Sequence, residues 1–337
     1  MLDLGVMVAA DDFPLPDAPL PDPAYPLSMW LCAACGLAQL TRDDTTTAEP
    51  LAVEPQALRD QAADAVTRVH AWTGLPAVGT VREFGSPHGG SWLPLFAERG
   101  WATSGERADV VVDGFGLMHE PDLAGATRER ADALADDGVL LLLFHSLETI
   151  VGKGQWSSLR HGHFGYFSTS ALVPLLASAG LAPVAAWEFS LYGGTVLLAA
   201  RCDGTPDATV TALLERERAA GVLDRDTVAG LQTAADAETA ALREALAADD
   251  RPWYAYGAAS RAVAVLHRAR ATPDRLVAVA DASPGKQGHT MPGTRIPIVS
   301  PEQLVAADPE RVWLLLPDLH DEVSAAYPAL TGRWATP

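Results

Sequence analysis

Two histidines that alternate with a glycine occupy the stretch best suited to acid–base chemistry. His161 and His163 flank Gly162 in SSLRHGHFGYFS, and Arg160 precedes them. A neutral imidazole titrates near pH 6.5, roughly cellular pH, so it can take up a proton there. The stretch follows a predicted strand, and ligands of open α/β sheets bind at the carboxyl ends of strands. His119 follows another predicted strand. Alternate histidines can also be ordinary surface residues.

A glycine-bearing turn lies further toward the amino terminus. Glu83, Gly85 and Gly89 belong to VREFGSPHGG, where a predicted strand runs into a helix. Glycine lets the backbone approach a ligand closely, and the N–H groups at the start of a helix can face that ligand. The same pattern also occurs in turns that only close a βα unit.

A second glycine turn opens the carboxyl-terminal part of the chain. Tyr256, Gly257 and Arg261 belong to YGAASR, which follows a predicted strand and begins a predicted helix. Asp281 ends the next predicted strand, and Lys286 follows shortly after it. This arrangement is typical of turns that bind the phosphate or ribose of a nucleotide. A tight turn without a ligand is the alternative.

The cysteine pair Cys32 and Cys35 has the spacing of half a zinc site. A closed tetrahedral site needs four ligands, and the sequence contains no second CxxC. We therefore expect no full structural zinc. The alternative is a buried or vestigial thiol pair beside apolar neighbours.

These stretches need at least two α/β lobes to position them. The apolar runs VREF, ADVVVDG and GVLLLLF predict buried strands, with a helix over DLAGATRERADALADDG, and APVAAWEF and TVLLAAR predict a hairpin-like pair. WYAY, RLVAVAD and RVWLLLPD predict a second sheet. We expect a small irregular lobe over residues 1–50, a Rossmann-like lobe over 51–204, a helical connector over 205–250 and an α/β lobe over 251–337.

The first sheet is expected to be incomplete. Between the first glycine turn and ADVVV the chain offers only SWLPLFAERGWATSGER. Two βα units of about 20 residues each do not fit in that interval. The sequence therefore predicts fewer strands than a complete lobe of this kind, with the turn at Gly85 beside a gap.

The composition excludes two classes of partner. The formal net charge is −19, so no basic field gathers nucleic acid. No apolar run of 18 residues offers a membrane span, and the amino terminus has no basic region typical of a secretory signal. We expect a cytoplasmic protein that binds a small molecule. The sequence does not predict an oligomeric state.

The motifs, taken in order, resemble the sugar C-methyltransferases of deoxysugar biosynthesis. The resemblance rests on LDLG, YPLSMWLCAACGLAQL, VREFGSPHGG, HGHFGYFS, YGG at 192–194, YGAASR and VADASPGKQGHTMPGTRIPIVSPEQL. It implies a zinc-binding lobe, here reduced, a methyltransferase lobe and a carboxyl-terminal α/β lobe. It also implies the use of S-adenosylmethionine to methylate carbon 3 of a 4-keto sugar nucleotide.

The resemblance also implies roles for individual residues. His163 matches the base that removes a proton next to the ketone, and His161 matches its neighbour. We expect the methyl donor at Glu83, Gly85, Gly89 and His119. The sugar nucleotide is expected at Tyr256, Gly257, Arg261, Asp281 and Lys286.

The sequence departs from the family pattern within the expected catalytic pocket. Arg160 and Gly162 stand where the family has Tyr and Glu, Tyr192 where it has His, and Phe115 where it has Asn. These departures leave two alternatives to methyl transfer. One is an isomerase, epimerase or cyclase that uses the histidines, with Arg160 holding an enolate oxygen. The other is a non-catalytic partner.

Overall fold

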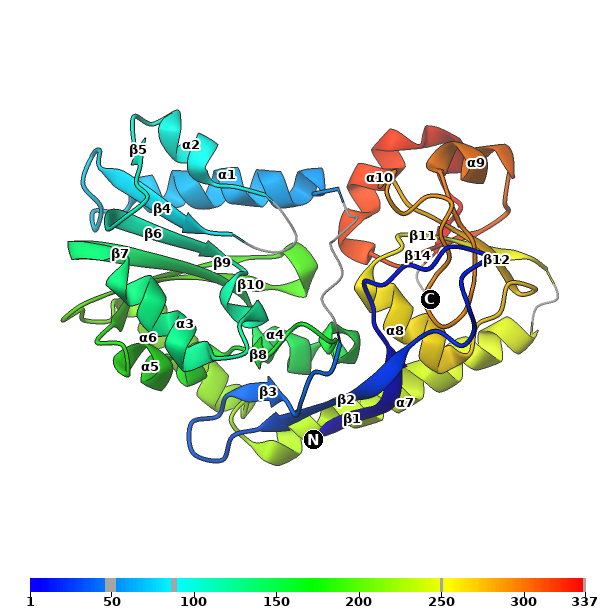
Figure 1. Cartoon of the computed structure of the whole chain (residues 1–337), viewed down its shortest axis with the longest axis horizontal. Helices are drawn as coiled ribbons and strands as arrows, with labels where there is room; N and C mark the ends of the chain where they lie inside the picture. Colours follow the sequence, from blue (N-terminus) through cyan, green and yellow to red (C-terminus); the bar gives the residue numbers. More distant parts are fainter. Residues whose placement is uncertain (46–52, 86–89, 249–250, 336–337) are drawn as a thin grey trace.

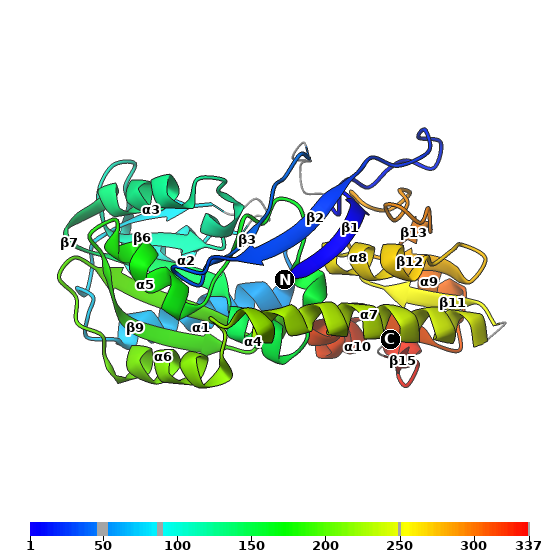
Figure 2. The same ribbon diagram turned by 90° about the horizontal axis from the view of Figure 1, so that it is seen from below.

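The computed structural model describes residues 1–45, 53–85, 90–248 and 251–335. Two α/β lobes lie side by side, and a small layer of strands lies below them in the view of Figure 1. The long helix α7 (Arg225–Ala248) runs along the base of the molecule from the first lobe to the second, as Figure 2 shows. In the described part of the chain, no helix is long and apolar enough to cross a bilayer.

The amino-terminal lobe is a sheet, so the prediction of an irregular lobe was wrong. Alternate residues of its first strand, Leu2 and Leu4, are buried, a period that the proline-rich sequence after it obscures. Over the described residues the antiparallel order is β1 (Leu2–Val8), β2 (Ala24–Leu31), β3 (Ala38–Leu40) and β8 (Gly165–Tyr166). Because β8 comes from the histidine stretch, this sheet fixes the start of the chain to the predicted site.

The first lobe has the predicted Rossmann-like sheet. Its described strands follow the order β5-β4-β6-β7-β10-β9. The last two strands pair antiparallel, which confirms the predicted hairpin-like pair. The strand bounds are β4 (Thr80–Phe84), β5 (Ala102–Thr103), β6 (Ala108–Gly114), β7 (Leu134–His145), β9 (Ala182–Phe189) and β10 (Thr195–Arg201).

Helices cover both faces of this sheet, which explains its continuous apolar runs. Side chains alternate in direction along a strand, so Val110 and Val112 pack on one face while Val111 packs on the other. The first face carries α1 (Gln56–Ala71) and α2 (Leu93–Ala97). The second carries α3 (Leu123–Asp132), α5 (Thr169–Ala177) and α6 (Ala208–Ala220). The short helix α4 (Leu147–Gly152) follows β7.

The sheet is truncated at its β5 edge, as predicted. Between β4 and β6 the described residues contain α2 and the two-residue β5, and residues 86–89 lie outside the description. Strand β5 pairs only with Thr80 and Val81. The carboxyl half of β4 has no described neighbour on that side, so Gly85 lies beside the expected gap.

One helix boundary differs from the prediction. The segment DLAGATRERADALADDG was expected to be helical throughout, but β7 begins at Leu134. Leu134 pairs with Ala108 of β6 and is buried, so burial in the sheet outweighs the helical propensity of the sequence.

The second lobe is a parallel sheet in the order β13-β12-β11-β14-β15 over the described residues. One face packs on α8 (Ser260–Ala269) and α7, and the other on α9 (Pro301–Ala306) and α10 (His320–Ala326). Helices α6 and α7 form the connector that the sequence predicts. The strand bounds are β11 (Trp253–Tyr256), β12 (Leu276–Ala280), β13 (Ile298–Val299), β14 (Val312–Leu314) and β15 (Trp334–Ala335).

Candidate functional site

A cavity of about 350 Å³ lies between the two lobes, and we call it the interlobe cavity. That volume is in the range of about 300–1,000 Å³ found for small-molecule sites. Most of the residues predicted for catalysis and nucleotide binding meet here, although they are far apart in the sequence. The polar and aromatic lining includes Asp11, Phe115, His145, Arg160, His163, Tyr192, Tyr256, Gly257, Ser260, Arg261, Asp281 and Lys286.

Arg160 joins three parts of the chain on one side of this cavity. Its Nε lies 2.7 Å from Nε2 of His163, and its Nη1 lies 2.9 Å from a carboxylate oxygen of Asp11. The same Nη1 donates to the Ser260 hydroxyl at 2.7 Å. A guanidinium can only donate, so Nε2 of His163 carries the lone pair and the imidazole is held neutral. That lone pair is the one a general base needs.

His119 holds the histidine segment in place rather than facing the interlobe cavity. Its Nδ1 donates to the Gly162 carbonyl at 2.8 Å, and its ring packs edge-on against His163 at 4.7 Å. Burial, with help from Arg160, lowers the pKa of His119 to about 4, so the imidazole stays neutral. His119 is not among the residues that line the interlobe cavity or the smaller pocket beside Glu83.

His161 is also turned away from the interlobe cavity. Its Nε2 lies 3.2 Å from the Pro26 carbonyl, and its ring packs against Tyr25. The side chain is buried and is not part of the described lining. Of the two alternate histidines, only His163 reaches the cavity.

Arg261, the residue after Ser260, contacts His145 and Tyr192. Its Nη2 lies 3.4 Å from Nδ1 of His145 and 3.4 Å from the Tyr192 carbonyl. Burial, followed by the charges of Arg261 and Arg160, lowers the pKa of His145 to about 3. No ion pair within the described residues involves Arg261. Burial lowers its pKa, and the negative charge of Asp318 opposes that shift. A largely buried cation of this kind favours an anionic ligand.

Tyr192 has a strained backbone beside Arg261. Its φ of +56° lies in the left-handed region, which is uncommon for an aromatic residue. Gly193 and Gly194, the next two residues, also have positive φ. The ring packs edge-on against His145 at 5.6 Å. Such strain is typical of positions where a side chain is held for a function.

The carboxyl-terminal turn is braced from beneath by Asp281 and Lys286. Asp281 accepts from the Ala258 N–H at 2.8 Å, and Lys286 donates to the Ala258 carbonyl at 2.7 Å. Gly257 has a φ of +102° and lies against Leu316, so a side chain there would be strained and crowded. Tyr256 lines the cavity beside the turn. Asp281 and Lys286 therefore hold the turn through hydrogen bonds to Ala258, and both also line the cavity.

The turn predicted to bind the methyl donor is held by hydrogen bonds between its own residues. The Glu83 carboxylate accepts from the Trp92 N–H at 2.7 Å and from the Ser91 hydroxyl at 2.5 Å. A side chain on Gly90 would meet the Glu54 carboxylate, so Glu54 lies directly against the turn. A Cβ atom added at Gly85 would meet no other atom within 4 Å. Gly89 lies outside the described residues.

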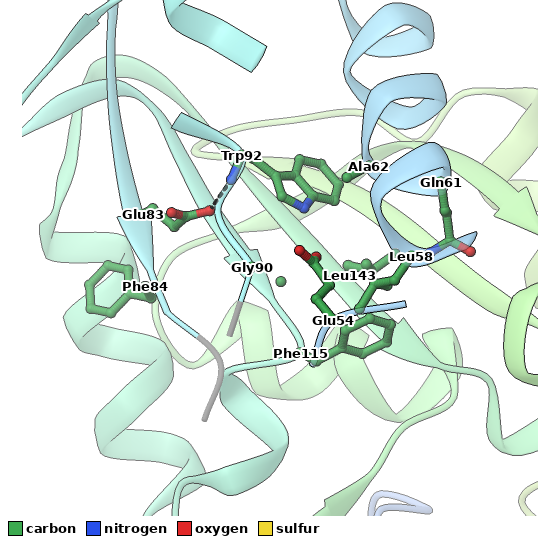
Figure 3. Close-up of a pocket in the computed structure, with 11 residues that line it drawn as sticks. Glu54, Leu58, Gln61, Ala62, Glu83, Phe84, Gly90, Trp92, Phe115 and Leu143 are labelled. Carbon is green, nitrogen blue, oxygen red and sulfur yellow. Dashed lines mark hydrogen bonds between the residues drawn. The ribbon is translucent and has the colours of Figure 1, made fainter. Parts of the chain in front are cut away.

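The pocket beside Glu83 is small. It has a volume of about 30 Å³, room for about two water molecules. Figure 3 shows the Glu54 carboxyl group within it, with the Trp92 indole and the Phe115 ring around it. A nucleoside-sized cofactor needs about ten times that volume. No described strand lies beside the carboxyl half of β4 to offer a ribose-binding acid, and residues 86–89 of the turn lie outside the described residues.

The cysteine pair forms a turn of the kind found in zinc knuckles. Gly36 donates to the Cys32 carbonyl at 2.8 Å, and both thiols are free. No group of three or more possible metal ligands occurs within the described residues.

Metal analysis of the purified protein is expected to find well under one zinc per chain. Two thiolates alone do not complete a tetrahedral site. Stoichiometric zinc that is lost from a Cys32→Ser variant would contradict this prediction.

Comparison with known proteins finds C-methyltransferases similar to parts of this chain. Residues 190–337 match the family described as the C-methyltransferase C-terminal domain. The chain is 29% identical over 205 residues to the C-methyltransferase NovU of Streptomyces niveus, a match that covers 59% of this chain. The chain spans about half, 49%, of that relative's length. These matches confirm the resemblance to the C-methyltransferases.

Solved structures of methyltransferases are similar to part of the chain. A Burkholderia thailandensis 1,6-didemethyltoxoflavin-N1-methyltransferase is 18% identical, with a TM-score of 0.35, over 50% of this chain and 96% of its own. The amino pentose methyltransferase CalS10 of Micromonospora echinaspora is 15% identical, with a TM-score of 0.28, over 44% of this chain and 98% of its own.

Asp11 and His145 are among the residues of the interlobe cavity that sequence reasoning missed. Asp11 lies 149 positions before Arg160, in a proline-rich segment without a recognisable motif. His145 ends β7, and its position directly after the apolar run GVLLLLF is the signal that could have identified it.

Proposed function

We propose that the protein binds a keto-deoxysugar nucleotide in the interlobe cavity and acts on the carbon next to its ketone, with the chemistry on which C-methyltransferases depend. The observation that carries this proposal is the convergence of Arg160 and His163 with the YGAASR turn on one cavity. C-methyl transfer is the activity that the family match supports.

The nucleotide end of the ligand would lie against the carboxyl-terminal lobe. Arg261 offers a cation without a carboxylate partner among the described residues, and the first turn of α8 offers backbone N–H groups. No side chain caps the start of α8. These groups together suit a diphosphate on a chain whose net charge would otherwise repel it.

The sugar end would face His163 and Arg160. The ketone oxygen of the substrate would draw the Arg160 guanidinium toward itself, because an oxygen on which negative charge develops is a better acceptor than a neutral imidazole. Once Arg160 donates to the ketone oxygen instead, the lone pair of His163 Nε2 is free to accept a proton. The imidazole then takes the proton from the neighbouring carbon, and Arg160 stabilises the enolate oxygen.

The residues of the interlobe cavity would bind the substrate and form the enolate. S-adenosylmethionine would supply a methyl group if bound. The described residues account for enolisation, and the turn predicted to bind the donor includes residues 86–89, which lie outside them.

Calorimetry and NMR together test the proposal. The purified protein is expected to bind thymidine diphosphate 4-keto-6-deoxyglucose and, in D₂O, to exchange the hydrogen next to the ketone for deuterium. Thymidine diphosphate alone should bind without any exchange. Absence of both binding and exchange with the sugar nucleotide would contradict the proposal.

A further inference from the structure

The cations that line the interlobe cavity differ in how their charge is compensated. Arg160 pairs with Asp11 at 2.9 Å, and Lys286 lies 3.8 Å from a carboxylate oxygen of Asp281. Arg261 lines the same cavity and takes part in no ion pair within the described residues. An anionic group that enters the cavity therefore meets one arginine beside a carboxylate and one arginine without such a neighbour.

Asp11 belongs to the connection between β1 and β2, which the carboxyl-terminal lobe holds in place. The Phe13 carbonyl accepts from Nδ1 of His289 at 2.6 Å, and the Pro14 carbonyl accepts from the Thr290 N–H at 2.9 Å. Phe13 itself is buried. Because these contacts fix the backbone two residues further on, Asp11 is presented to Arg160 by an anchored segment.

The Asp11 carboxylate offsets the charge of Arg160 at the histidine end of the cavity. The Arg160 side chain is only 6% exposed, and a buried cation without an anion beside it attracts anionic ligands. The opposite effects of the two charges are visible at the neighbouring His119. Burial lowers the pKa of His119 most and the charge of Arg160 lowers it further, whereas the charge of Asp11 raises it.

On these observations, and resting on the proposed function, we propose that Asp11 is a positioning residue that sets the direction in which the sugar nucleotide binds. By pairing with Arg160, Asp11 withholds this guanidinium from the diphosphate and leaves it for the uncharged ketone. The diphosphate goes to Arg261, which directs the sugar end to His163. Without Asp11 the cavity would offer two arginines to the diphosphate, and part of the ligand would bind in reverse.

The other contacts of Arg160 suit this role. Its Nη1 is held by Asp11 and by the Ser260 hydroxyl, while its Nε lies on His163. A guanidinium is planar, so holding two of its nitrogens fixes its orientation. Its Nε can change partner from the imidazole to the ketone oxygen while Nη1 stays in place. Asp11 therefore acts on the reaction through Arg160.

Calorimetric titration with inorganic pyrophosphate tests this inference. Arg261→Ala is expected to bind pyrophosphate more weakly than wild type. Adding Asp11→Asn to that variant should raise the affinity again by roughly tenfold, near the lower end for a hydrogen bond to a charged group, because Arg160 becomes available to the anion. A merely structural role of Asp11 would not restore binding, and the restored binding itself shows that the double variant is folded.

Two further variants serve as controls in the Arg261→Ala background. Asp11→Glu keeps the carboxylate and should not restore the affinity. Asp12→Asn changes the net charge by the same amount as Asp11→Asn, at an exposed residue outside the described lining of the cavity. It should not restore the affinity either.

Deuterium exchange of thymidine diphosphate 4-keto-6-deoxyglucose gives a second readout. Asp11→Asn alone should lower kcat and KM for this exchange by similar factors, because ligand bound in reverse occupies the cavity without reacting. Asp12→Asn should leave both unchanged.

Three results would overturn the role of Asp11 and leave the proposed function intact. The first is a double variant that binds pyrophosphate no better than Arg261→Ala, and the second is equal restoration by Asp12→Asn. The third is an affinity of Arg261→Ala equal to that of wild type, because the anion then does not lie at Arg261. Absence of exchange in wild-type protein would instead overturn the proposed function, and the pyrophosphate titrations judge Asp11 independently of it.

Discussion

His163→Gln is expected to lower the rate of deuterium exchange next to the ketone by about 10²–10⁴-fold, the usual contribution of a general base. Glutamine keeps a polar group near Arg160 but has no nitrogen lone pair that can take a proton. Affinity for the sugar nucleotide should change little, because we propose that its nucleotide end binds to the other lobe. NMR in D₂O gives the rate and calorimetry the affinity.

An exposed histidine is the control for this substitution. His320→Gln, at the start of α10 beside Asp321, should leave both quantities unchanged. If His163→Gln exchanges as fast as wild type, or if it loses binding and exchange to the same degree, His163 is not the base.

Arg261→Ala is expected to weaken sugar-nucleotide binding by about 1–3 kcal/mol, the range for hydrogen bonds to charged groups. That corresponds to a loss of roughly 5- to 150-fold in the dissociation constant. The cause is removal of a cation that lies beside Tyr192 and His145 and has no carboxylate partner in the described chain. Titration calorimetry with thymidine diphosphate measures the effect without the sugar.

The same helix offers a matched control. Arg268→Ala, near the carboxyl end of α8, removes a cation that pairs with Asp236 instead. It should leave nucleotide affinity unchanged. Equal affinity of Arg261→Ala and wild type would show that the diphosphate does not lie at this turn.

The two central sheets could be predicted because their strands are covered on both sides. Runs such as VVV in ADVVVDG and VLLLLF in GVLLLLF are continuously apolar, which is typical of strands buried by helices on both faces. The amino-terminal sheet could not be predicted in the same way. A proline-rich segment separates β1 from β2, and the partners of this sheet lie in the histidine stretch and the connector.

The candidate site was predicted where local sequence carries the chemistry. The YGAASR turn and His163 reach one cavity because each follows a strand whose carboxyl end faces the other lobe. The orientation of His161 and the closure of Glu83 on Trp92 depend on contacts distant in sequence or on competing hydrogen bonds. Neither can be read from residue types and spacing.

The core beneath the interlobe cavity has a consequence for protein engineering. One continuous apolar cluster contains side chains of β1 and β2, of the helical connector and of the carboxyl-terminal sheet, with Leu2, Leu27, Leu231, Val263 and Val279 among them. The carboxyl-terminal part is therefore not a detachable module. A chimera that exchanges this part between relatives would have to carry β1, β2 and α7 with it, or leave a newly exposed apolar face on each half.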